Sequence, residues 1–129
     1  MKIYFDQYLR NALYDKGGYY HDESSIKEKG DFITSPQVSD LFGFFISSYI
    51  SLHSSKFFNK KPFSIVEIGC NDGLLSSQIL NHLKSTNLDL YENINYIIIE
   101  QNTHLKKNIL LNLRGHEKKI EITNKLKKS

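Results

Sequence analysis

The sequence predicts an α/β protein in which an incomplete parallel sheet follows an N-terminal helical segment. Two observations predict this fold. First, between residues 63 and 83, a β-branched run leads into a glycine-containing turn and then into a helical pattern of leucines and isoleucines. Second, a further apolar run, residues 96–99, ends in Glu100. Strand, glycine loop and helix is the form in which α/β folds present a nucleoside cofactor, and an acid closing the next strand can accept hydrogen bonds from ribose.

The composition of the whole chain narrows its class. Its 129 residues fit one domain. Much of the net charge of +3 lies in the tail, residues 118–128, which we expect to be a solvated end rather than a nucleic-acid site. No apolar run is long enough to cross a bilayer, so membrane insertion is not expected, and the first residues lack the apolar stretch of a signal peptide. The single cysteine, Cys70, excludes an internal disulfide and a cysteine-based zinc site, which fits a reducing compartment.

The first predicted helix covers residues 4–14. Its apolar residues recur at the i, i+3, i+4, i+7 spacing of an amphipathic helix. Gly17 and Gly18 should end it, because glycine accepts the left-handed conformation found at helix ends. The polar segment that follows, residues 21–29, has no periodicity, and we expect it to be an exposed loop.

A second helix is predicted to begin at Ser35 and Pro36, because serine can cap the first free amides and proline suits the first helical position. It should continue through Leu52, with an apolar face so broad that most of the helix is expected to be buried. Gly43 inside this helix costs about 1 kcal/mol relative to alanine, which indicates close packing against a neighbour. A polar connector is then expected over residues 53–61.

The remaining elements repeat the strand and helix alternation. After the central strand, loop and helix, we expect a loop over residues 85–93 and a second strand over 96–100. A helix capped by Thr103 and ended by Gly115 follows, and then the start of a third strand, 120–123. Two strands and part of a third make a poor sheet, which indicates the front of a larger domain that stops early. The predicted domains are residues 1–62, the helical segment, and 63–129, the start of the cofactor-binding part.

The charge of the glycine loop favours one cofactor over another. A dinucleotide loop reads G-x-G-x-x-G, whereas this loop is G-x-x-x-G with Asn71 at the middle glycine position. Glu67 and Asp72 would repel a pyrophosphate by roughly 3 kcal/mol for unit charges about 5 Å apart at an effective dielectric near 20. S-adenosylmethionine carries a sulfonium, an ammonium and no phosphate, and Glu100 can hold its ribose. The sequence therefore favours S-adenosylmethionine over NAD.

Simpler explanations exist for each of these residues. Gly69 and Gly73 can serve only a tight strand-to-helix turn, and Glu67 can cap a neighbouring amide. Glu100 can be an ordinary acid at the end of a strand, and Cys70 is better explained as a small turn residue than as a nucleophile. The histidines show no metal-ligand spacing, and we expect all of them to be surface or hydrogen-bonded residues: His21, His53, His82, His104 and His116.

A second motif indicates the family. Residues 30–36 read GDFITSP, followed by Val38-Ser39 and Phe42-Gly43. With the loop and the strand ending in Glu100, this resembles the N-terminal part of the MidA-like class I methyltransferases, whose mitochondrial members act in complex I assembly. The match runs from about residue 4 to residue 113 and covers about the first third of a typical member. The resemblance implies an incomplete Rossmann-like methyltransferase sheet, a truncated chain and S-adenosyl-L-methionine as cofactor.

The resemblance also implies the roles of individual residues. The methionine end of the cofactor would lie against the loop, Glu100 would hold the ribose, and the segment at Ser35 would form a wall of the site. It implies no metal ligand and no identifiable catalytic base. The implied cofactor-binding residues are Thr34, Ser35, Pro36, Glu67, Gly69, Cys70, Asn71, Asp72, Gly73 and Glu100. The family usually has G-P-G-x-G in the loop, so Cys70 and Asn71 depart from its pattern.

Three hypotheses about function follow. The first is a methyltransferase with a protein acceptor, implied to be arginine by the mitochondrial relatives. The second is a non-catalytic remnant of such an enzyme that binds the cofactor or a partner. The third, a dinucleotide-binding fragment, is disfavoured by the acidic loop. The expected location is the cytoplasm of a bacterium, or the mitochondrion if the source is eukaryotic, and no oligomeric state is predicted.

Overall fold

The computed structural model describes residues 3–20, 33–58 and 62–125, so residues 30–32 of the GDFITSP motif and the predicted loop 21–29 lie outside it. The chain divides into two compact units, residues 1–33 and 34–129, and each is described by itself. None of the helices within the described ranges combines the length and the hydropathy that a bilayer span requires.

The first unit contains α1, Phe5–Tyr14, which confirms the predicted first helix. The helix ends where the two glycines follow. Gly17 has φ of +89°, and the Tyr19 and Tyr20 N–H groups donate back to carbonyls of the last helical turn, at 3.0 and 2.8 Å. The left-handed glycine therefore turns the chain back onto the helix end, as the sequence predicts.

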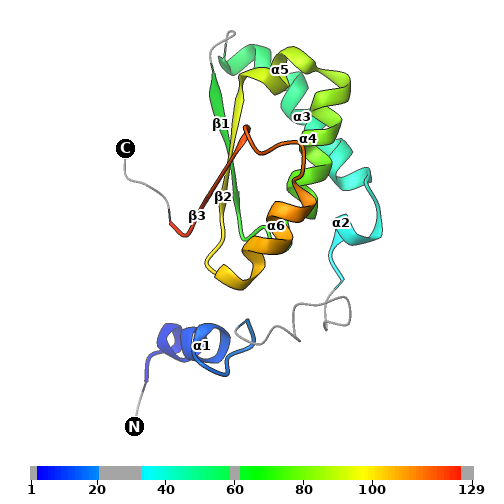
Figure 1. Cartoon of the computed structure of the whole chain (residues 1–129). Helices are drawn as coiled ribbons and strands as arrows, with labels where there is room; N and C mark the ends of the chain where they lie inside the picture. Colours follow the sequence, from blue (N-terminus) through cyan, green and yellow to red (C-terminus); the bar gives the residue numbers. More distant parts are fainter. Residues whose placement is uncertain (1–2, 21–32, 59–61, 126–129) are drawn as a thin grey trace. The chain divides into compact units, whose positions relative to one another are not determined.

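The second unit is built on a sheet of three parallel strands in the order β1-β2-β3, which confirms the α/β class (Figure 1). The strands are β1 Phe63–Ile68, β2 Ile94–Ile99 and β3 Ile120–Thr123. Because parallel strands need crossover connections, helices lie between them in the sequence. The helices of this unit are α2 Ser35–Val38, α3 Leu41–Phe58, α4 Leu74–Thr86, α5 Leu88–Asn93, η2 Thr103–Leu105 and α6 Lys106–Asn112.

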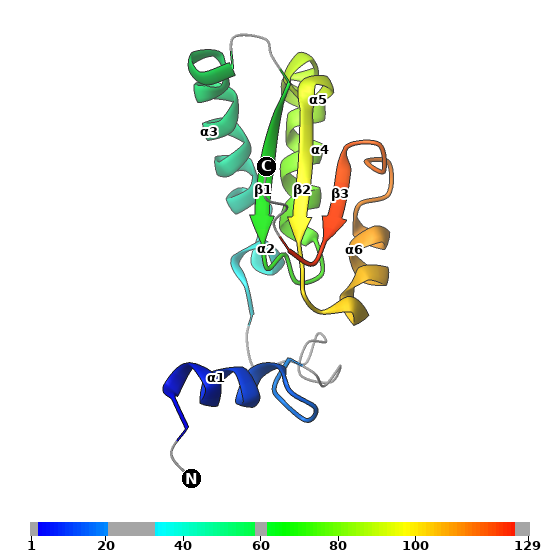
Figure 2. The same ribbon diagram turned by 90° about the vertical axis from the view of Figure 1, so that its left-hand side faces the viewer.

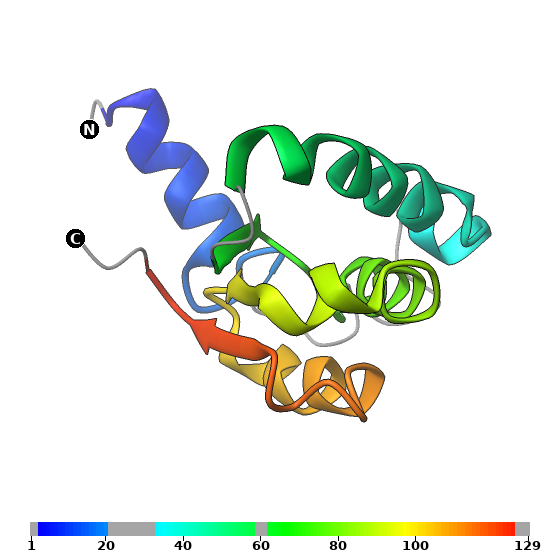
Figure 3. The same cartoon turned by 90° about the horizontal axis from the view of Figure 1, so that it is seen from above.

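The helices cover one face of the sheet (Figure 2). Seen from above, α4 lies between α3 and α6 (Figure 3). The covered face presents Tyr96 and Ile98 of β2, which are 1% and 0% exposed. Leu80 and Leu83 of α4 are buried on this side of the sheet. Ile109 of α6 and Leu113, which follows α6, are buried there as well. This layer of buried side chains is the core of the unit.

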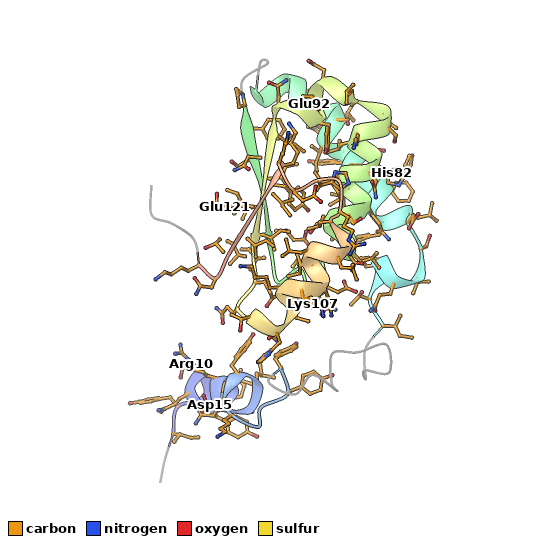
Figure 4. The ribbon with its side chains drawn as sticks, viewed as in Figure 1. Arg10, Asp15, His82, Glu92, Lys107 and Glu121 are labelled. Carbon is orange, nitrogen blue, oxygen red and sulfur yellow. The ribbon has the colours of Figure 1, made fainter. Side chains whose placement is uncertain are left out.

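The opposite face of the sheet carries alternate residues of the same strands. Strand register places Val66, Ile97 and Glu121 side by side on it, followed by Ile68 and Ile99. Figure 4 shows Glu121 on the side of β3 away from the helices. No helix of the described second unit covers this face, and Val66 and Ile68 are 44% and 71% exposed.

The predicted second helix is in fact two helices. α2 ends at Val38 and α3 begins at Leu41, where the Ser39 hydroxyl accepts the Leu41 N–H at 3.2 Å. The residue that caps α2 is Thr34 rather than Ser35, and the Gln37 side-chain oxygen accepts the Thr34 N–H at 2.8 Å. Local side-chain acceptors thus interrupt a pattern that apolar periodicity alone reads as continuous.

The prediction that most of this helix is buried is wrong for α3. Only one side of α3 packs against α4, and its other side is exposed in the second unit. Leu41, Phe45, Tyr49 and Leu52 are each at least 60% exposed. A broad apolar face does not by itself show what covers it.

Three further boundaries differ from the predictions. The polar connector expected from residue 53 is helical as far as Phe58, and the expected loop over 85–93 is largely α5. Asn87 starts α5 by accepting the Leu90 N–H at 3.2 Å. Asn102, rather than Thr103, caps the last helical segment by accepting the His104 N–H at 3.0 Å. Asparagine caps begin two of these helices, and neither was recognised in the sequence.

Gly43 is where α3 meets α4. A Cβ atom at this position would lie 2.4 Å from Gln78 Cβ, a separation that real Cβ atoms do not reach. The close packing predicted from the cost of a glycine inside a helix is therefore confirmed. Gly43 allows the two helix backbones to approach.

Replacing Gly43 by alanine should destabilise the protein despite the better helix propensity of alanine. The overpacking should cost about 1–3 kcal/mol in the free energy of unfolding, measured by urea denaturation. Ser48→Ala, at an exposed position of the same helix, is the control and should change stability by less than about 0.5 kcal/mol. Equal effects of the two substitutions would contradict the close contact.

His116 lies in a buried hydrogen-bond network that joins α4, α5 and the turn before β3. Its side chain is 3% exposed. Nε2 donates to Asn81 Oδ1 at 3.0 Å, and Nδ1 accepts from the Tyr91 hydroxyl at 2.9 Å. Burial, and next the charge of Lys84, lower the pKa of His116 below its ordinary value, because the charged ring would be desolvated and would lose its acceptor nitrogen. The histidines were predicted to be surface or hydrogen-bonded residues, and His116 is hydrogen-bonded.

The stability of the second unit should fall when the pH falls below about 6.5. The lowered pKa means that the unfolded chain binds a proton at His116 before the folded chain does, so stability is full above this window and is lost below it, by up to about 1.4 kcal/mol per pH unit. Urea denaturation at pH 7.5, 6.5 and 5.5 measures it. His116→Gln should reduce the slope, whereas His104→Gln, at an exposed position, should not. An unchanged slope in His116→Gln would refute the assignment.

Candidate cofactor site

The glycine loop joins the end of β1 to the start of α4. Three of its five residues have left-handed backbone: Gly69 with φ of +72°, Asn71 with +56° and Gly73 with +81°. Glycine adopts this region at no steric cost, and asparagine tolerates it better than most residues. The sequence departs from the family pattern at Asn71, but the backbone there has the conformation that a glycine would favour.

The two glycines play different parts in the loop. A Cβ atom on Gly73 would lie 3.2 Å from the Ile109 side chain, so α6 packs directly against the loop at this point. A Cβ atom on Gly69 would meet nothing within 4 Å. Gly73 is therefore needed for both conformation and packing, while the surroundings of Gly69 leave room for another group.

Hydrogen bonds from three elements fix the loop. The Gly69 N–H donates to the Ile99 carbonyl at 2.9 Å, which extends the pairing of β1 with β2 into the loop. Asp72 is held twice: its side chain accepts the Leu74 N–H at 3.1 Å, and its carbonyl accepts the Asn112 side chain of α6 at 3.0 Å. The chain's own hydrogen bonds thus fix the loop geometry.

Glu67, the last acid before the loop, faces the helices. Its Oε2 accepts two hydroxyls, from Ser76 of α4 at 2.5 Å and from Tyr96 of β2 at 2.8 Å. Burial, and next the charge of Glu67, raise the pKa of Tyr96, which keeps this hydroxyl a donor. Among the described residues, both groups that donate to the Glu67 carboxylate are hydroxyls, so the alternative that Glu67 caps a neighbouring amide finds no support there. Two donors orient its carboxylate beneath the loop.

Cys70 is a buried loop residue near three carboxylates. The side chain is 5% exposed. Burial, and next the charges of Glu67, Glu100 and Asp72 in that order, raise the pKa of its thiol to about 12. A thiol with this pKa stays protonated and is a poor nucleophile, which agrees with a turn residue. The negative charges of three carboxylates, one on β1, one in the loop and one just after β2, thus raise the pKa of the same thiol.

Glu100 follows β2 at the same edge of the sheet as the loop. Ile68 and Ile99, the residues before Gly69 and Glu100, are paired in register. The Glu100 N–H donates to the Thr123 carbonyl at 2.9 Å, and its Oε1 accepts the Asn102 N–H at 2.9 Å. The carboxylate is consequently held in one orientation next to the loop.

The segment from Thr34 to Pro36 consists of the cap and the first two residues of α2. In Figures 1 and 2, α2 lies at the level of the carboxyl end of β1, where the loop begins. The side chain of Gln78 of α4 donates to the Pro36 carbonyl at 2.8 Å. Thr34 and Ser35 are exposed.

The structure thus brings the loop residues, Glu67 and Glu100 to one end of the sheet, with α2 at the same level. Sequence reasoning missed the side chains that hold them: Ser76, Gln78, Tyr96 and Asn112. One signal was available, since Ser76 and Gln78 are polar residues inside the apolar pattern of the helix. Among the described residues, no group of three or more His, Cys, Asp or Glu side chains is arranged to hold a metal ion.

Comparison with known proteins identifies the family. Residues 45–128 match the family model described as "Putative S-adenosyl-L-methionine-dependent methyltransferase". The chain belongs to this methyltransferase family. The matched region includes all three strands, the glycine loop and Glu100, which confirms the resemblance that the sequence motifs indicated.

Curated proteins of known sequence are similar to part of this chain. The Drosophila melanogaster mitochondrial protein named protein arginine methyltransferase NDUFAF7 homolog is 33% identical over 78 residues, 60% of this chain and 18% of that protein. Mouse protein arginine methyltransferase NDUFAF7, also mitochondrial, is 36% identical over 80 residues, 57% of this chain and 17% of that protein. The chain spans less than a fifth of the length of these curated relatives.

A solved structure shows the same fold. A COG1565 superfamily member from Burkholderia thailandensis, bound to S-adenosyl-homocysteine, superposes with a TM-score of 0.75 at 21% identity, over 97% of this chain and 33% of that chain. A native structure from the same organism gives a TM-score of 0.71 at 23% identity. The methyltransferase-like architecture predicted for this chain is therefore confirmed at the level of fold.

Asn71→Ala and Asn71→Gly should separate backbone strain from side-chain effects in the loop. Alanine should destabilise the protein by about 1 kcal/mol because it adopts the left-handed conformation less readily, and glycine should not. Thermal and urea unfolding measure both. Asn108→Ala, at an exposed position of α6, is the control. Equal stability of the alanine and glycine variants would contradict the left-handed conformation at residue 71.

Proposed function

We propose that this chain carries the S-adenosyl-L-methionine site of a methyltransferase, at the carboxyl ends of β1 and β2. The observation that carries the proposal is the convergence of three carboxylates, Glu67, Asp72 and Glu100, on the glycine loop. Glu67 lies two residues before Gly69 on β1, Asp72 is part of the loop, and Glu100 follows Ile99, which is paired in register with Ile68. A ligand that binds there must tolerate or exploit negative charge.

Charge decides between the two cofactors that such a loop can serve. A pyrophosphate would bring two further negative charges to this edge of the sheet. S-adenosyl-L-methionine brings an ammonium and a sulfonium next to the carboxylates, where opposite charges attract. The site thus supports the methyltransferase cofactor over a dinucleotide, in agreement with the family to which the chain belongs.

The residues present fit the proposed cofactor. Gly69 has open space where a side chain would be, so a ligand can approach the backbone. Glu100, oriented by the Asn102 N–H, would accept ribose hydroxyls through its carboxylate. The turn at Cys70, Asn71 and Gly73, together with Asp72 and Glu67, would hold the methionine end, and Thr34, Ser35 and Pro36 would form a wall of the site.

The cofactor would supply a methyl group on a sulfonium, which an acceptor can attack directly. The work of the chain itself would be to bind and orient. Fixed carboxylates and a preformed loop hold a ligand in one pose and cost no reorganisation when it binds. No residue among those described is assigned as a base.

We also propose that the acceptor is a protein, and an arginine side chain within it. The support is that the relatives from fly and mouse are named protein arginine methyltransferases. The acceptor and the activity belong to the whole protein, because this chain covers less than a fifth of those relatives.

Calorimetric titration with S-adenosylhomocysteine tests the cofactor site. We expect a dissociation constant near 10 μM, about −7 kcal/mol. Glu100→Gln should weaken binding about tenfold or more, because it removes the charge and one acceptor while preserving the size of the side chain. Glu117→Gln, at an exposed turn away from the loop, is the control and should bind like the unaltered chain.

Competition separates this proposal from its rival. NAD should not displace S-adenosylhomocysteine at millimolar concentration. Tighter binding of NAD than of S-adenosylhomocysteine would refute the proposal and favour a dinucleotide site. A folded chain that gives no heat with either ligand would refute the cofactor site altogether.

A further inference from the structure

Gln78 is a buried polar residue that connects two segments distant in sequence. It lies in α4 and is 6% exposed. Its Nε2 donates to the Pro36 carbonyl at 2.8 Å and to Asp40 Oδ1 at 3.0 Å. Pro36 belongs to α2, and Asp40 lies between α2 and α3. One side-chain amide therefore holds both ends of the α2 segment.

The orientation of this amide is fixed by its partners. Both are acceptors, so turning the amide over would place the Gln78 oxygen against two other oxygens. In the orientation observed, Oε1 is buried without a hydrogen-bond partner among the described residues. A buried carbonyl in this state costs free energy that an apolar side chain of the same size would not.

Gly43 completes this contact from α3. A Cβ atom at Gly43 would lie 2.4 Å from Gln78 Cβ and 2.9 Å from Oε1. Only a glycine leaves room for Gln78 at this helix crossing. The amide is thus held between α3 on one side and the α2 segment on the other, and its rotamer is restricted by packing.

The position of Gln78 along α4 relates it to the glycine loop. It follows Leu74, the first residue of the helix, by four residues, which is about 6 Å along the axis at 1.5 Å per residue. The loop that precedes Leu74 is itself fixed by hydrogen bonds to β2 and α6. A rigid helix turn thus connects the loop to the residue that holds α2.

We propose that Gln78 is a positioning residue that holds α2, with Thr34, Ser35 and Pro36, in place as a wall of the cofactor site. This inference rests on the proposed function. Among the hydrogen bonds of the described residues, the Gln78 amide supplies the one that ties α2 to α4, and the other bonds of this four-residue helix are local. A helix of this length is too short to be stable by itself, so its place depends on this bond and on its packing against α3 and α4. The side chain that fixes the wall would therefore act on binding without contacting the cofactor.

Gln78→Met tests the role, because methionine has a similar length and no amide. Hydrogen exchange followed by mass spectrometry should show exchange at residues 34–41 faster by about tenfold or more, the effect of losing roughly one net hydrogen bond. Exchange at residues 79–83, in the buried part of α4, should not change. Gln7→Met, at an exposed position of α1, is the matched control.

Binding distinguishes positioning from simple support of the fold. At a temperature where the variant is fully folded, Gln78→Met should weaken S-adenosylhomocysteine binding about tenfold, whereas a supporting residue would lower only the melting temperature. Thr34→Ala should weaken binding in the unaltered chain and have little further effect in Gln78→Met, because α2 is already released. Additive effects of the two substitutions would overturn the proposal.

The binding and hydrogen-exchange measurements test the two proposals separately. No binding by the unaltered, folded chain would overturn the proposed function. Unchanged exchange at residues 34–41 in Gln78→Met would overturn the role of Gln78, whatever the binding result. If Gln78→Met does not fold, Gln78→Asn replaces it, since its amide is one methylene shorter and should reach only one of the two acceptors. Full protection of residues 34–41 in that variant would equally refute the proposal.

Discussion

The pairing of β1 with β2 is the interaction on which the rest of the second unit depends. Register places Ile68 beside Ile99, and the Gly69 N–H continues the pairing to the Ile99 carbonyl. This one ladder fixes where the loop turns, on which face Glu67 lies and where Glu100 emerges. A shift of register by one residue would move Glu67 to the uncovered face, away from Ser76 and Tyr96. The register of the sheet therefore determines where the acidic side chains of the site lie.

Much of this arrangement could be predicted from the sequence, because it depends on local patterns. The β-branched runs, the glycines at the turn and the acid after β2 predicted the parallel strands, their order along the chain and the end of the sheet where the loop lies. The motif at Ser35 and the loop predicted the family. The roles of the loop residues and of Glu100 in binding the cofactor stay predictions.

The sequence did not predict features that depend on contacts between distant segments. The role of Gln78 was not predicted, because its partners, Pro36 and Asp40, lie about 40 residues earlier. The burial of α3 was overestimated, because hydrophobicity shows that a face can be covered but not what covers it. Helix caps at Thr34, Asn87 and Asn102 were missed or displaced, since several polar residues near each start can serve as a cap.

The sheet face that no described helix of the second unit covers has a consequence for handling the protein. Val66 and Ile68 of β1 are exposed on this face, and Val66 is paired with Ile97 of the adjacent strand β2. Contiguous exposed aliphatic side chains favour association with similar surfaces, and higher protein concentration increases this association. A preparation of this chain is therefore most useful when dilute, and its colloidal behaviour reports on that face as directly as a binding assay reports on the loop.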